Sequence, residues 1–303
     1  MKFLITGGAG FIGSHIAEEI LKEKKGEVVV FDNLSVGNEN NIPQGCAFIK
    51  GDIRNKGEVE EAMKGVDIVF HDAACVTIRG SFEKFKEVAE TNCLGTKNVF
   101  NAAKKAGAKK IVFASSMGVY GEPEYLPVDE DHTLNPNSPY GLSKEMGELY
   151  CQILEKEHGI ETVALRYFNT YGTRQTPSPY VGVITTFINQ ALSGQPLTIF
   201  GTGQQTRDFV WVKDIVQANL LAAFSGTTGI FNIGSGQEIS VNQIADMIIG
   251  HLGGEKKYIE NPATEINRIS ADIKKAKEEL GYSPKGELSQ LMPSLIDWWK
   301  NRV

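Results

Sequence analysis

Three glycines near the amino terminus constrain the fold more than any other feature of the sequence. Gly7, Gly10 and Gly13 directly follow the apolar run 3–5 and open a segment whose apolar residues recur with helical spacing. In a strand–turn–helix unit, the first glycine of such a loop permits a tight turn, the second lets the backbone approach a pyrophosphate, and the third lets the helix pack on the sheet. The loop therefore predicts a parallel α/β sheet that binds a dinucleotide.

Short β-branched runs alternate with helix-sized segments over the first 170 residues. Continuously apolar runs are typical of parallel strands covered on both faces. Six such strand–helix units predict a Rossmann-type, doubly wound α/β sheet with right-handed crossovers. The expected strands are 3–5, 28–31, 48–49, 68–70, 111–113 and 162–165, and the expected helices between them include 12–23, 85–105 and 138–158.

The rhythm changes after Asn169, where the segment 172–182 carries two prolines and several polar residues. We expect a dinucleotide-binding domain at 1–170 and a smaller α/β region at 171–303 that mainly binds the substrate, with some chain returning to the main sheet. Ligands of such folds bind at the carboxyl ends of the strands, so the active site is expected between the two regions. The elements expected in the second region are helices at 183–192, 214–224, 241–251, 273–280 and 288–299 and strands at 197–200 and 208–212.

Composition disfavours several classes of function. The chain has 31 Lys+Arg and 37 Asp+Glu, a net charge of −6, which offers no basic face to nucleic acid. No apolar run approaches the roughly 20 residues that span a bilayer, and no signal-peptide pattern precedes the first strand, so we expect a cytoplasmic protein without a membrane partner. The cysteines are scattered singly, which favours small buried apolar roles and no metal site. They are Cys46, Cys75, Cys93 and Cys151.

Two acidic residues at strand ends bear on the cofactor. Asp32 ends the second expected strand, where a carboxylate accepts hydrogen bonds from an adenosine ribose and repels a 2′-phosphate. No Arg or Lys follows it in 33–37, so NAD is favoured over NADP. Asp52 and Ile53 follow the third strand at a level where an adenine could rest, although an ordinary strand-end cap explains Asp52 equally well.

A tyrosine and a lysine four residues apart suggest the chemistry. Tyr140 and Lys144 lie at the start of an expected helix, and this spacing places the phenol and the ammonium on one face. Tyrosine has a pKa of about 10 and serves as a base near neutrality only if its anion is stabilised, since a shift of ~3 pKa units needs ~4 kcal/mol. The lysine and a cationic nicotinamide would supply that field. Ser116, at the end of the fifth strand, can hydrogen-bond a substrate oxygen whose proton Tyr140 removes.

Taken together, these motifs resemble the extended short-chain dehydrogenase/reductase family, and most closely its nucleotide-sugar epimerases of the UDP-glucose 4-epimerase type. The resemblance covers 3–299. It implies that Tyr140 is the acid/base on the sugar C4 hydroxyl, that Lys144 binds the nicotinamide ribose and lowers the tyrosine pKa, and that Ser116 positions the hydroxyl and shuttles its proton. It further implies a recycled NAD cofactor, a UDP-sugar substrate and a homodimer built from the helices 85–105 and 138–158. The motifs that carry it are the glycine loop, 71–74, 92–96, 114–121, Tyr140 with Lys144, 165–169 and 205–210.

The resemblance also assigns binding residues. For the cofactor they are Gly7, Gly10, Phe11, Ile12, Gly13, Asp32, Asn33, Ser35, Gly37, Asp52, Ile53, Ala73, Ala74, Asn92, Ser115, Tyr140 and Lys144. For the substrate they are Thr77, Ser116, Tyr140, Asn169, Val183, Thr198, Phe200, Arg207, Arg268 and Ile269, with Asn169 and Arg207 on the diphosphate and the strand 197–200 beside the uracil.

The sequence departs from the family pattern near its carboxyl end. The family commonly has a phosphate-binding Arg-x-Gly-Asp segment, but the aligned residues here are Pro-Ala-Thr-Glu at 262–265, and Arg268 is the neighbouring candidate for that role. Ile269 aligns with a position that gates the sugar pocket, where a bulky tyrosine excludes N-acetyl sugars. Because isoleucine is smaller, we expect tolerance of UDP-GlcNAc and UDP-GalNAc.

Several alternatives are weighed against an epimerase. A 4,6-dehydratase of this family has an Asp-Glu pair after the catalytic hydroxyl, and the residues here are Met117 and Gly118, so the elimination lacks its acid and base. A nucleotide-sugar reductase, a decarboxylase or another epimerase can keep the same Ser, Tyr and Lys and stays open. A non-catalytic dinucleotide sensor has no use for the Tyr–Lys pair and is disfavoured.

Overall fold

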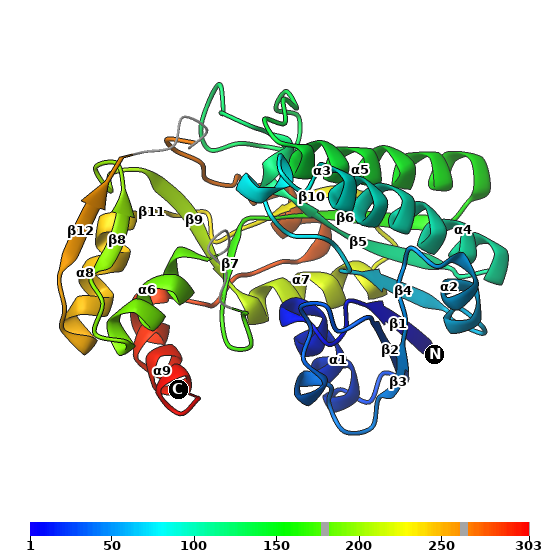
Figure 1. Cartoon of the computed structure of the whole chain (residues 1–303). Helices are drawn as coiled ribbons and strands as arrows, with labels where there is room; N and C mark the ends of the chain where they lie inside the picture. Colours follow the sequence, from blue (N-terminus) through cyan, green and yellow to red (C-terminus); the bar gives the residue numbers. More distant parts are fainter. Residues whose placement is uncertain (177–181, 261–265, 303) are drawn as a thin grey trace.

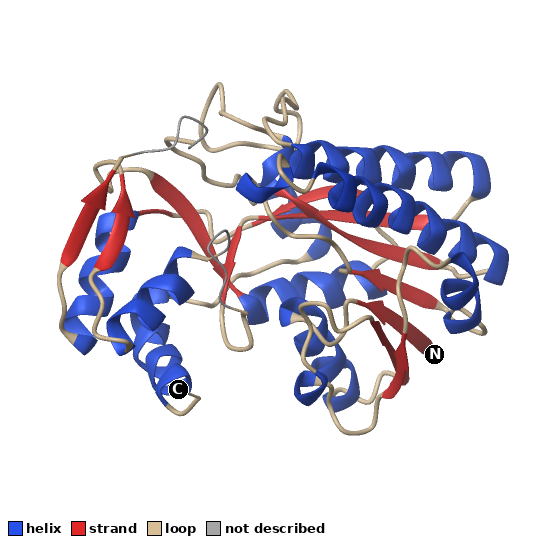
Figure 2. Cartoon of the chain, viewed as in Figure 1, coloured by secondary structure: helices blue, strands red, loops and turns tan. Residues whose placement is uncertain are grey.

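A parallel sheet of seven strands forms the centre of the molecule (Figure 2). The computed structural model describes residues 1–176, 182–260 and 266–302. The strands are β1 (Lys2–Thr6), β2 (Glu27–Asp32), β3 (Ala47–Lys50), β4 (Ile68–His71), β5 (Lys110–Ser116), β6 (Glu161–Tyr167) and β10 (Gly229–Ile233). Their order in the sheet is β10-β6-β5-β4-β1-β2-β3. The six expected strands and the Rossmann-type fold are therefore confirmed, and a seventh strand is added from the far half of the chain.

Helices cover both faces of the sheet (Figure 1). One face packs on α1 (Phe11–Lys22) and α7 (Val212–Phe224), and the other packs on α2 (Lys56–Ala62), α4 (Thr96–Ala106) and α5 (Pro139–His158). Side chains alternate along β1, since Phe3 and Ile5 belong to the first core and Leu4 to the second, and all three are fully buried. Burial on both faces explains why the strands are continuously apolar rather than alternating.

The helix expected at 85–105 is not regular. It consists of α3 (Phe85–Val88), a π-helical segment η3 (Ala89–Gly95) and α4. Gly95 lies against the side chain of Ile53, where an added Cβ would be 2.6 Å from its nearest atom. The wider π-helical turn brings Asn92 toward the loop after β4. Tertiary contacts thus replace the regular α-helix that the spacing of apolar residues predicts. Segments of this kind are frequent at functional sites.

The carboxyl-terminal half forms a smaller region with two short sheets, ordered β11-β9-β7 and β12-β8. Its strands are β7 (Asn169–Tyr171), β8 (Leu197–Phe200), β9 (Thr206–Trp211), β11 (Glu238–Ser240) and β12 (Lys256–Ile259), and its helices are α6 (Val183–Leu192), α8 (Val241–Leu252) and α9 (Leu288–Lys300). The strand expected at 208–212 begins and ends earlier than predicted, because Val212 is the first residue of α7. The helix expected at 273–280 is mainly a π-helical turn, η5 (Ala276–Leu280).

A buried carboxylate joins the small region to the main sheet. Asp208, on β9, accepts hydrogen bonds from the backbone nitrogen and hydroxyl of Ser235 at 2.7 and 2.6 Å, from the nitrogen of Gly236 at 2.9 Å and from the nitrogen of Ala271 at 3.2 Å. These residues follow β10 or lie in the segment before η5. The strand β10 and the helix α7 are thus the parts of the second half that contribute to the main sheet and its covering layer.

The expectation that all four cysteines are buried is wrong for three of them. Cys151 is buried in the core beneath α5, whereas Cys46, Cys75 and Cys93 are half-buried. Burial raises the pKa of Cys46 to about 11, which keeps it a thiol. In the described ranges, no cluster of acidic, histidine and cysteine side chains could hold a metal ion, and no helix is long and apolar enough to cross a membrane.

Candidate active site

The glycine loop forms a cradle at the carboxyl end of β1. Gly7 has φ +71°, and an added Cβ would lie 2.8 Å from the backbone nitrogen of Ala73. Gly10 is the N-cap of α1 and provides no side-chain cap, so the first backbone N–H groups of the helix are left for another acceptor. An uncapped helix amino terminus behind a glycine loop suits an anionic pyrophosphate.

Asp32 supports this cradle from the end of β2. One carboxylate oxygen accepts the backbone N–H of Ala9 at 3.0 Å, and the other accepts that of Leu34 at 2.8 Å. A carboxylate has about four acceptor positions, so each oxygen can still accept a ribose hydroxyl. The residue thus fits the sugar end of a dinucleotide, as its position after the second strand predicted.

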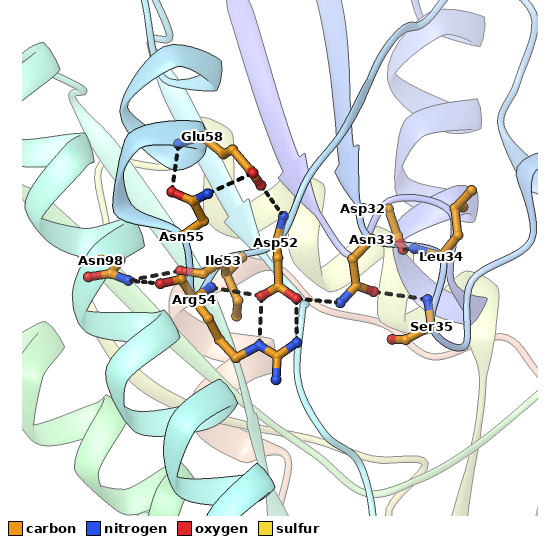
Figure 3. Close-up of polar contacts among 10 residues, drawn as sticks. All are labelled: Asp32, Asn33, Leu34, Ser35, Asp52, Ile53, Arg54, Asn55, Glu58 and Asn98. Carbon is orange, nitrogen blue, oxygen red and sulfur yellow. Dashed lines mark hydrogen bonds and ion pairs between the residues drawn. The ribbon is translucent and has the colours of Figure 1, made fainter.

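A second acidic residue, Asp52, connects the ends of β2 and β3 (Figure 3). Its Oδ1 accepts the backbone nitrogen and Nε of Arg54, both at 2.9 Å, and its Oδ2 accepts Nη2 of Arg54 at 2.6 Å and Nδ2 of Asn33 at 2.9 Å. The hydrogen bonds from Arg54 lower the pKa of Asp52 to about 2. All four acceptor positions of the Asp52 carboxylate are used within the protein. Asp52 is therefore a strand-end cap, which was one of the two interpretations that the sequence allowed. Its partner Arg54 was missed in the sequence analysis.

Neighbouring groups hold this turn in place (Figure 3). Asn55 caps the amino end of α2 and donates to Glu58 at 2.7 Å, and Glu58 accepts the backbone nitrogen of Asp52 at 2.8 Å. Asn98, on α4, donates to the carbonyl oxygen of Ile53 at 3.0 Å. Asn55 followed by Glu58 at the third position is a helix-start pattern that could have revealed the arrangement. The turn that contains Asp52 and Ile53 is therefore held by side chains from two helices, α2 and α4.

Several more of the expected cofactor residues use their polar side chains within the protein. Asn92 accepts the nitrogen of Cys75 at 2.7 Å and donates to the carbonyl of Cys75 at 3.2 Å and to the hydroxyl of Ser143 at 3.0 Å. Ser115 donates to Glu148 at 2.5 Å. Asn33 and Ser35 are exposed after β2, and the nitrogen of Ser35 donates to Asn33 at 2.9 Å. The remaining ones are half-buried: Phe11, Ile12, Gly37, Ala73 and Ala74.

The helix α5 places the expected acid/base pair beside β5. Ser138 caps α5 by accepting the nitrogen of Gly141 at 3.1 Å, and Pro139 occupies the first turn. Gly141 permits close approach, because an added Cβ would lie 2.2 Å from the carbonyl oxygen of Gly118. Tyr140 is therefore held against the segment that follows Ser116.

Ser116, Tyr140 and Lys144 come together at the carboxyl end of β5, as the sequence predicts. The Ser116 hydroxyl accepts the nitrogen of Gly118 at 3.1 Å and hydrogen-bonds the Tyr140 phenol. Lys144 Nζ donates to the carbonyl of Ala114 at 2.7 Å and lies 5.8 Å from the centre of the Tyr140 ring. A hydroxyl, a phenol and an ammonium thus converge at the same edge of the sheet as the glycine cradle, with β4 between β5 and β1.

Burial has the largest effect on the ionisation of Tyr140 and Lys144 in the protein alone. Burial raises the pKa of Tyr140 to about 12, and the hydrogen bond from Ser116 opposes this rise only in part. Burial also lowers the pKa of Lys144 to about 8, against the attraction of Asp72 and Glu148. From the sequence we expect Lys144 and a cationic nicotinamide together to lower the tyrosine pKa, and this stays a prediction for the NAD-bound enzyme. The additional positive charge of an oxidised nicotinamide is therefore needed before the phenol can act as a base near neutrality.

A buried ion pair under α5 was missed. Arg166, on β6, binds Glu148 through Nε at 2.9 Å and Nη2 at 2.8 Å, and both side chains are only 2% exposed. Arg166 also donates to the hydroxyl of Tyr120 at 2.8 Å, which donates to Asn232 on β10 at 2.6 Å. Glu148 stands four residues after Lys144, so both lie on the same face of the helix. This spacing, together with an arginine inside an apolar strand, is the sequence feature that could have revealed the ion pair.

The expected diphosphate residues lie on adjacent strands. Asn169 pairs with Phe209 in the β7–β9 ladder, and Arg207 is two residues before Phe209. Oδ1 of Asn169 is buried without a hydrogen-bond partner in the described parts of the chain. Arg207 is buried and donates to the carbonyl of Thr206 at 2.7 Å. An orphaned amide oxygen and a buried guanidinium on neighbouring strands suit a polar ligand.

The other expected substrate residues vary in exposure. Thr77 is buried and accepts the nitrogen of Gly80 at 3.1 Å. Thr198 bonds Gln190 of α6 through its nitrogen at 3.1 Å and its hydroxyl at 3.2 Å. Val183 and Phe200 are half-buried, at the start of α6 and the end of β8.

The candidate for the diphosphate, Arg268, and the candidate for the sugar pocket, Ile269, differ in burial. The side chain of Arg268 is 61% exposed and binds both oxygens of Glu238, at 2.8 and 2.9 Å. Ile269 is fully buried in the core that includes α1 and α7. The segment 262–265, which replaces the family's Arg-x-Gly-Asp, lies outside the described residues.

The Rossmann-type sheet, the glycine cradle with Asp32 and the Ser–Tyr–Lys trio define an extended short-chain dehydrogenase/reductase. The model of the NAD dependent epimerase/dehydratase family matches residues 3–234, and the chain belongs to this family. It is therefore an NAD-dependent enzyme, with Gly7, Gly10 and Asp32 suited to hold the cofactor.

Sequence relatives include two different activities. A protein of Methanocaldococcus jannaschii, provisionally named as a UDP-glucose 4-epimerase, is 47% identical and covers 98% of both chains. The UDP-N-acetyl-alpha-D-glucosaminuronate decarboxylase of Bacillus cytotoxicus is 37% identical over 99% of this chain and 98% of its own length.

Solved structures show the same fold. The UDP-glucose 4-epimerase of Thermotoga maritima with UDP-glucose superposes with a TM-score of 0.96 at 34% identity and covers 100% of this chain and 99% of its own. That of Thermus thermophilus with NAD has a TM-score of 0.94 at 34% identity, with 100% of both chains covered. The UDP-N-acetylglucosamine 4-epimerase of Methanobrevibacter ruminantium has a TM-score of 0.94 at 32% identity, covering 100% and 99%.

Proposed function

We propose that this enzyme epimerises UDP-hexoses at C4, interconverting UDP-glucose and UDP-galactose through a transient 4-ketosugar. The observation that carries the proposal is the meeting of Ser116, Tyr140 and Lys144 at the edge of the sheet that also holds the glycine cradle. Oxidation of a hydroxyl needs a base at the hydroxyl and a hydride acceptor next to the carbon, and this arrangement can provide both.

The protein side chains move the proton of the C4 hydroxyl and orient that hydroxyl. Tyr140, once ionised, removes the proton of the C4 hydroxyl, and Ser116 hydrogen-bonds that hydroxyl and the phenol together. Lys144 stabilises the phenolate electrostatically. NAD, which Gly7, Gly10 and Asp32 would hold, would supply the hydride acceptor and donor for this chemistry. When the ketosugar has turned over, Tyr140 returns its proton to the C4 oxygen, so the reaction is neutral overall.

Asn169 and Arg207 are proposed to hold the diphosphate, and the strand β8 to flank the uracil. The buried orphan oxygen of Asn169 and the buried guanidinium of Arg207 support this assignment. We further propose that N-acetylated sugars are accepted, because Ile269 is smaller than a tyrosine. The likeness to a UDP-N-acetylglucosamine 4-epimerase supports this extension.

Decarboxylation of a UDP-hexuronic acid is the second candidate. It begins with the same oxidation at C4, after which the carboxyl group β to the ketone leaves as CO2, so the same trio would serve it. The 37% identity to a decarboxylase of a UDP-sugar acid favours its inclusion in the test.

The enzyme is proposed to act as a homodimer through α5. Four exposed apolar residues recur along this helix at helical spacing, at exposures of 49–52%. They are Leu142, Met146, Leu149 and Ile153, called the α5 stripe below. An exposed apolar stripe of this kind is typical of a helix that packs on a partner.

The deciding experiment offers UDP-galactose, UDP-GalNAc and UDP-glucuronate to the purified enzyme without added reductant, and separates the products by chromatography. We expect conversion of the first two toward a mixture of C4 epimers. Tyr140→Phe should reduce turnover by roughly 10²–10⁴-fold while NAD is retained, since the acid/base is lost. Tyr258→Phe, on an exposed ring of β12, should leave turnover unchanged.

Three outcomes contradict the proposal. CO2 and a UDP-pentose from UDP-glucuronate alone would establish the decarboxylase. Stoichiometric consumption of added NADH would establish a reductase. No product from any sugar, with NAD-loaded protein, would exclude UDP-hexose 4-epimerisation.

A further inference from the structure

A row of buried polar side chains crosses the main sheet beneath α5. Ser115 of β5 lies opposite Arg166 of β6, and Arg166 lies opposite Asn232 of β10 in the parallel registers. All three residues are at most 2% exposed. Paired positions of neighbouring parallel strands point to the same face of a sheet, and Glu148 of α5 binds Ser115 and Arg166 on this face. A fully hydrogen-bonded buried network of this kind holds its members in one arrangement.

Tyr120 binds this row from the segment that follows β5. It is fully buried, and its hydroxyl accepts a hydrogen bond from Nη1 of Arg166 at 2.8 Å and donates one to Oδ1 of Asn232 at 2.6 Å. The guanidinium of Arg166 also lies 4.8 Å from the centre of the Tyr120 ring, which is a cation–π contact. Asn232 is fixed in turn, because its amide donates to the carbonyl oxygen of Val128 at 3.0 Å. The hydroxyl of Tyr120 is therefore held on two sides.

The attachments at Ser115 and Tyr120 enclose residues 116–119, called the serine turn below. Ser115 directly precedes the serine turn and donates to Glu148 at 2.5 Å, and Tyr120 directly follows it and binds Arg166. Glu148 and Arg166 bind each other at 2.9 and 2.8 Å. Both ends of the serine turn are thus attached to one buried ion pair.

The serine turn determines where the hydroxyl of Ser116 lies. Ser116 Oγ accepts the backbone nitrogen of Gly118 at 3.1 Å and hydrogen-bonds the phenol of Tyr140. The backbone nitrogen of Tyr120 closes the turn by donating to the carbonyl oxygen of Met117 at 3.1 Å. A displacement of about 1 Å takes a hydroxyl out of hydrogen-bonding range, so the position of Ser116 depends on how firmly the ends of its turn are held.

We propose that Tyr120 is a positioning residue, which anchors the serine turn to the buried ion pair and so keeps the Ser116 hydroxyl within reach of Tyr140. The kinetic consequence rests on the proposed function, whereas the anchoring of the turn does not. A hydroxyl that is already in place needs no reorganisation when the sugar reacts, and such pre-organisation accelerates the chemical step rather than substrate binding. Loss of the anchor therefore lowers kcat and leaves KM unchanged.

The kinetic test uses Tyr120→Phe, which keeps the ring and removes the hydroxyl that binds Arg166. With UDP-galactose and NAD-loaded enzyme, we expect kcat to fall roughly 10-fold at an unchanged KM. In a Ser116→Ala background, whose residual turnover is measured at a higher enzyme concentration, the same substitution should cause little further loss, because the hydroxyl to be positioned is absent. Equal losses of kcat in the two backgrounds would overturn the proposal. If Tyr120→Phe does not fold, Ser115→Ala releases the other end of the serine turn and takes its place.

The matched control is Tyr282→Phe. Tyr282 is 1% exposed, and its hydroxyl donates to the carbonyl oxygen of Gly234 at 2.8 Å. Both tyrosine variants should lose Tm, because each leaves a buried polar group without its partner, but only Tyr120→Phe should lose kcat. A similar loss of kcat in Tyr282→Phe would show that destabilisation alone lowers turnover, and would overturn the positioning role of Tyr120.

A second test needs no activity, so it separates failure of this inference from failure of the proposed function. The backbone N–H of Gly118 is bonded to Ser116 Oγ, so its exchange with solvent reports the order of the serine turn. Hydrogen exchange measured by mass spectrometry should be faster over 116–121 in Tyr120→Phe than in the wild type, and unchanged there in Tyr282→Phe. Unchanged exchange in Tyr120→Phe would overturn the inference even in an active epimerase. Faster exchange in a protein that turns over no UDP-sugar would support the anchor and contradict the proposed function alone.

Discussion

Charged side chains that are removed from water lie directly behind the proposed catalytic residues. Glu148 binds Arg166 through two hydrogen bonds and accepts a third from Ser115, the neighbour of Ser116. Pairs of this kind contribute little net stability compared with an apolar replacement, but removal of one partner leaves a buried charge without compensation. We infer that the pair fixes the position of α5 relative to β5 and β6.

At this scale we predict the effect of Glu148→Gln on unfolding by urea. The substitution should reduce the free energy of unfolding by about 3–5 kcal/mol, because the guanidinium of Arg166 stays buried without its carboxylate. The control is Arg268→Gln, which breaks the exposed ion pair with Glu238 and should cost at most ~1 kcal/mol. Similar losses for the two variants would show that burial does not determine the strength of these pairs.

The helix α5 serves two purposes along its 20 residues. One face carries Tyr140, Lys144 and Glu148, all buried, and another carries the α5 stripe, which is half exposed. Figure 1 shows α3 and α4 beside α5, so the stripe extends a layer of helices on the outer side of the sheet. The association of two such layers would therefore stiffen the helix that holds the catalytic residues.

At the level of this element we predict that Leu149→Lys converts a dimer into a monomer, as measured by light scattering. A lysine in the middle of the stripe would have to lose its hydration in the interface, which is unfavourable. Tyr258→Lys, at a similar exposure of 51% on β12, should leave the dimer intact. A monomeric wild type, or a dimeric Leu149→Lys variant, would contradict an interface through α5.

The two halves of the chain share one core across the face of the sheet that packs on α1. Side chains of β1 and α1 lie in the same cluster as those of α7, β10 and η5. Asp208 adds four hydrogen bonds between β9 and the segments after β10 and before η5. Residues 1–170 therefore lack an edge strand and a covering helix that the complete chain provides.

For the whole molecule we predict that the fragment 1–170 does not fold cooperatively by itself. Without α7 and β10, the apolar side chains that face α1 and α7 stay in contact with water on part of that face. The complete chain should show a single cooperative thermal transition, and the fragment should show none by near-UV circular dichroism. A sharp transition of the fragment would support two independently folding domains.

The sequence alone determined the fold class, the glycine loop and the three residues proposed to be catalytic. Apolar runs define buried parallel strands, and glycines at fixed spacing define the cradle, because both depend on neighbours within a few residues. Tyr140 and Lys144 could be paired for the same reason, since one helical turn separates them. The boundaries of β8 (197–200) were predicted as observed, and those of the six main strands to within a few residues.

Contacts between distant segments were decided only by the tertiary structure. The strand β10 joins β6 across more than 60 residues of sequence, and Lys144 of α5 reaches the carbonyl oxygen of Ala114 on β5. The charge of a buried group depends on everything packed around it, so neither the raised pKa of Tyr140 nor that of Asp72 could be read from local spacing. Sequence periodicity carries local geometry, whereas desolvation and strand order arise when the whole chain packs.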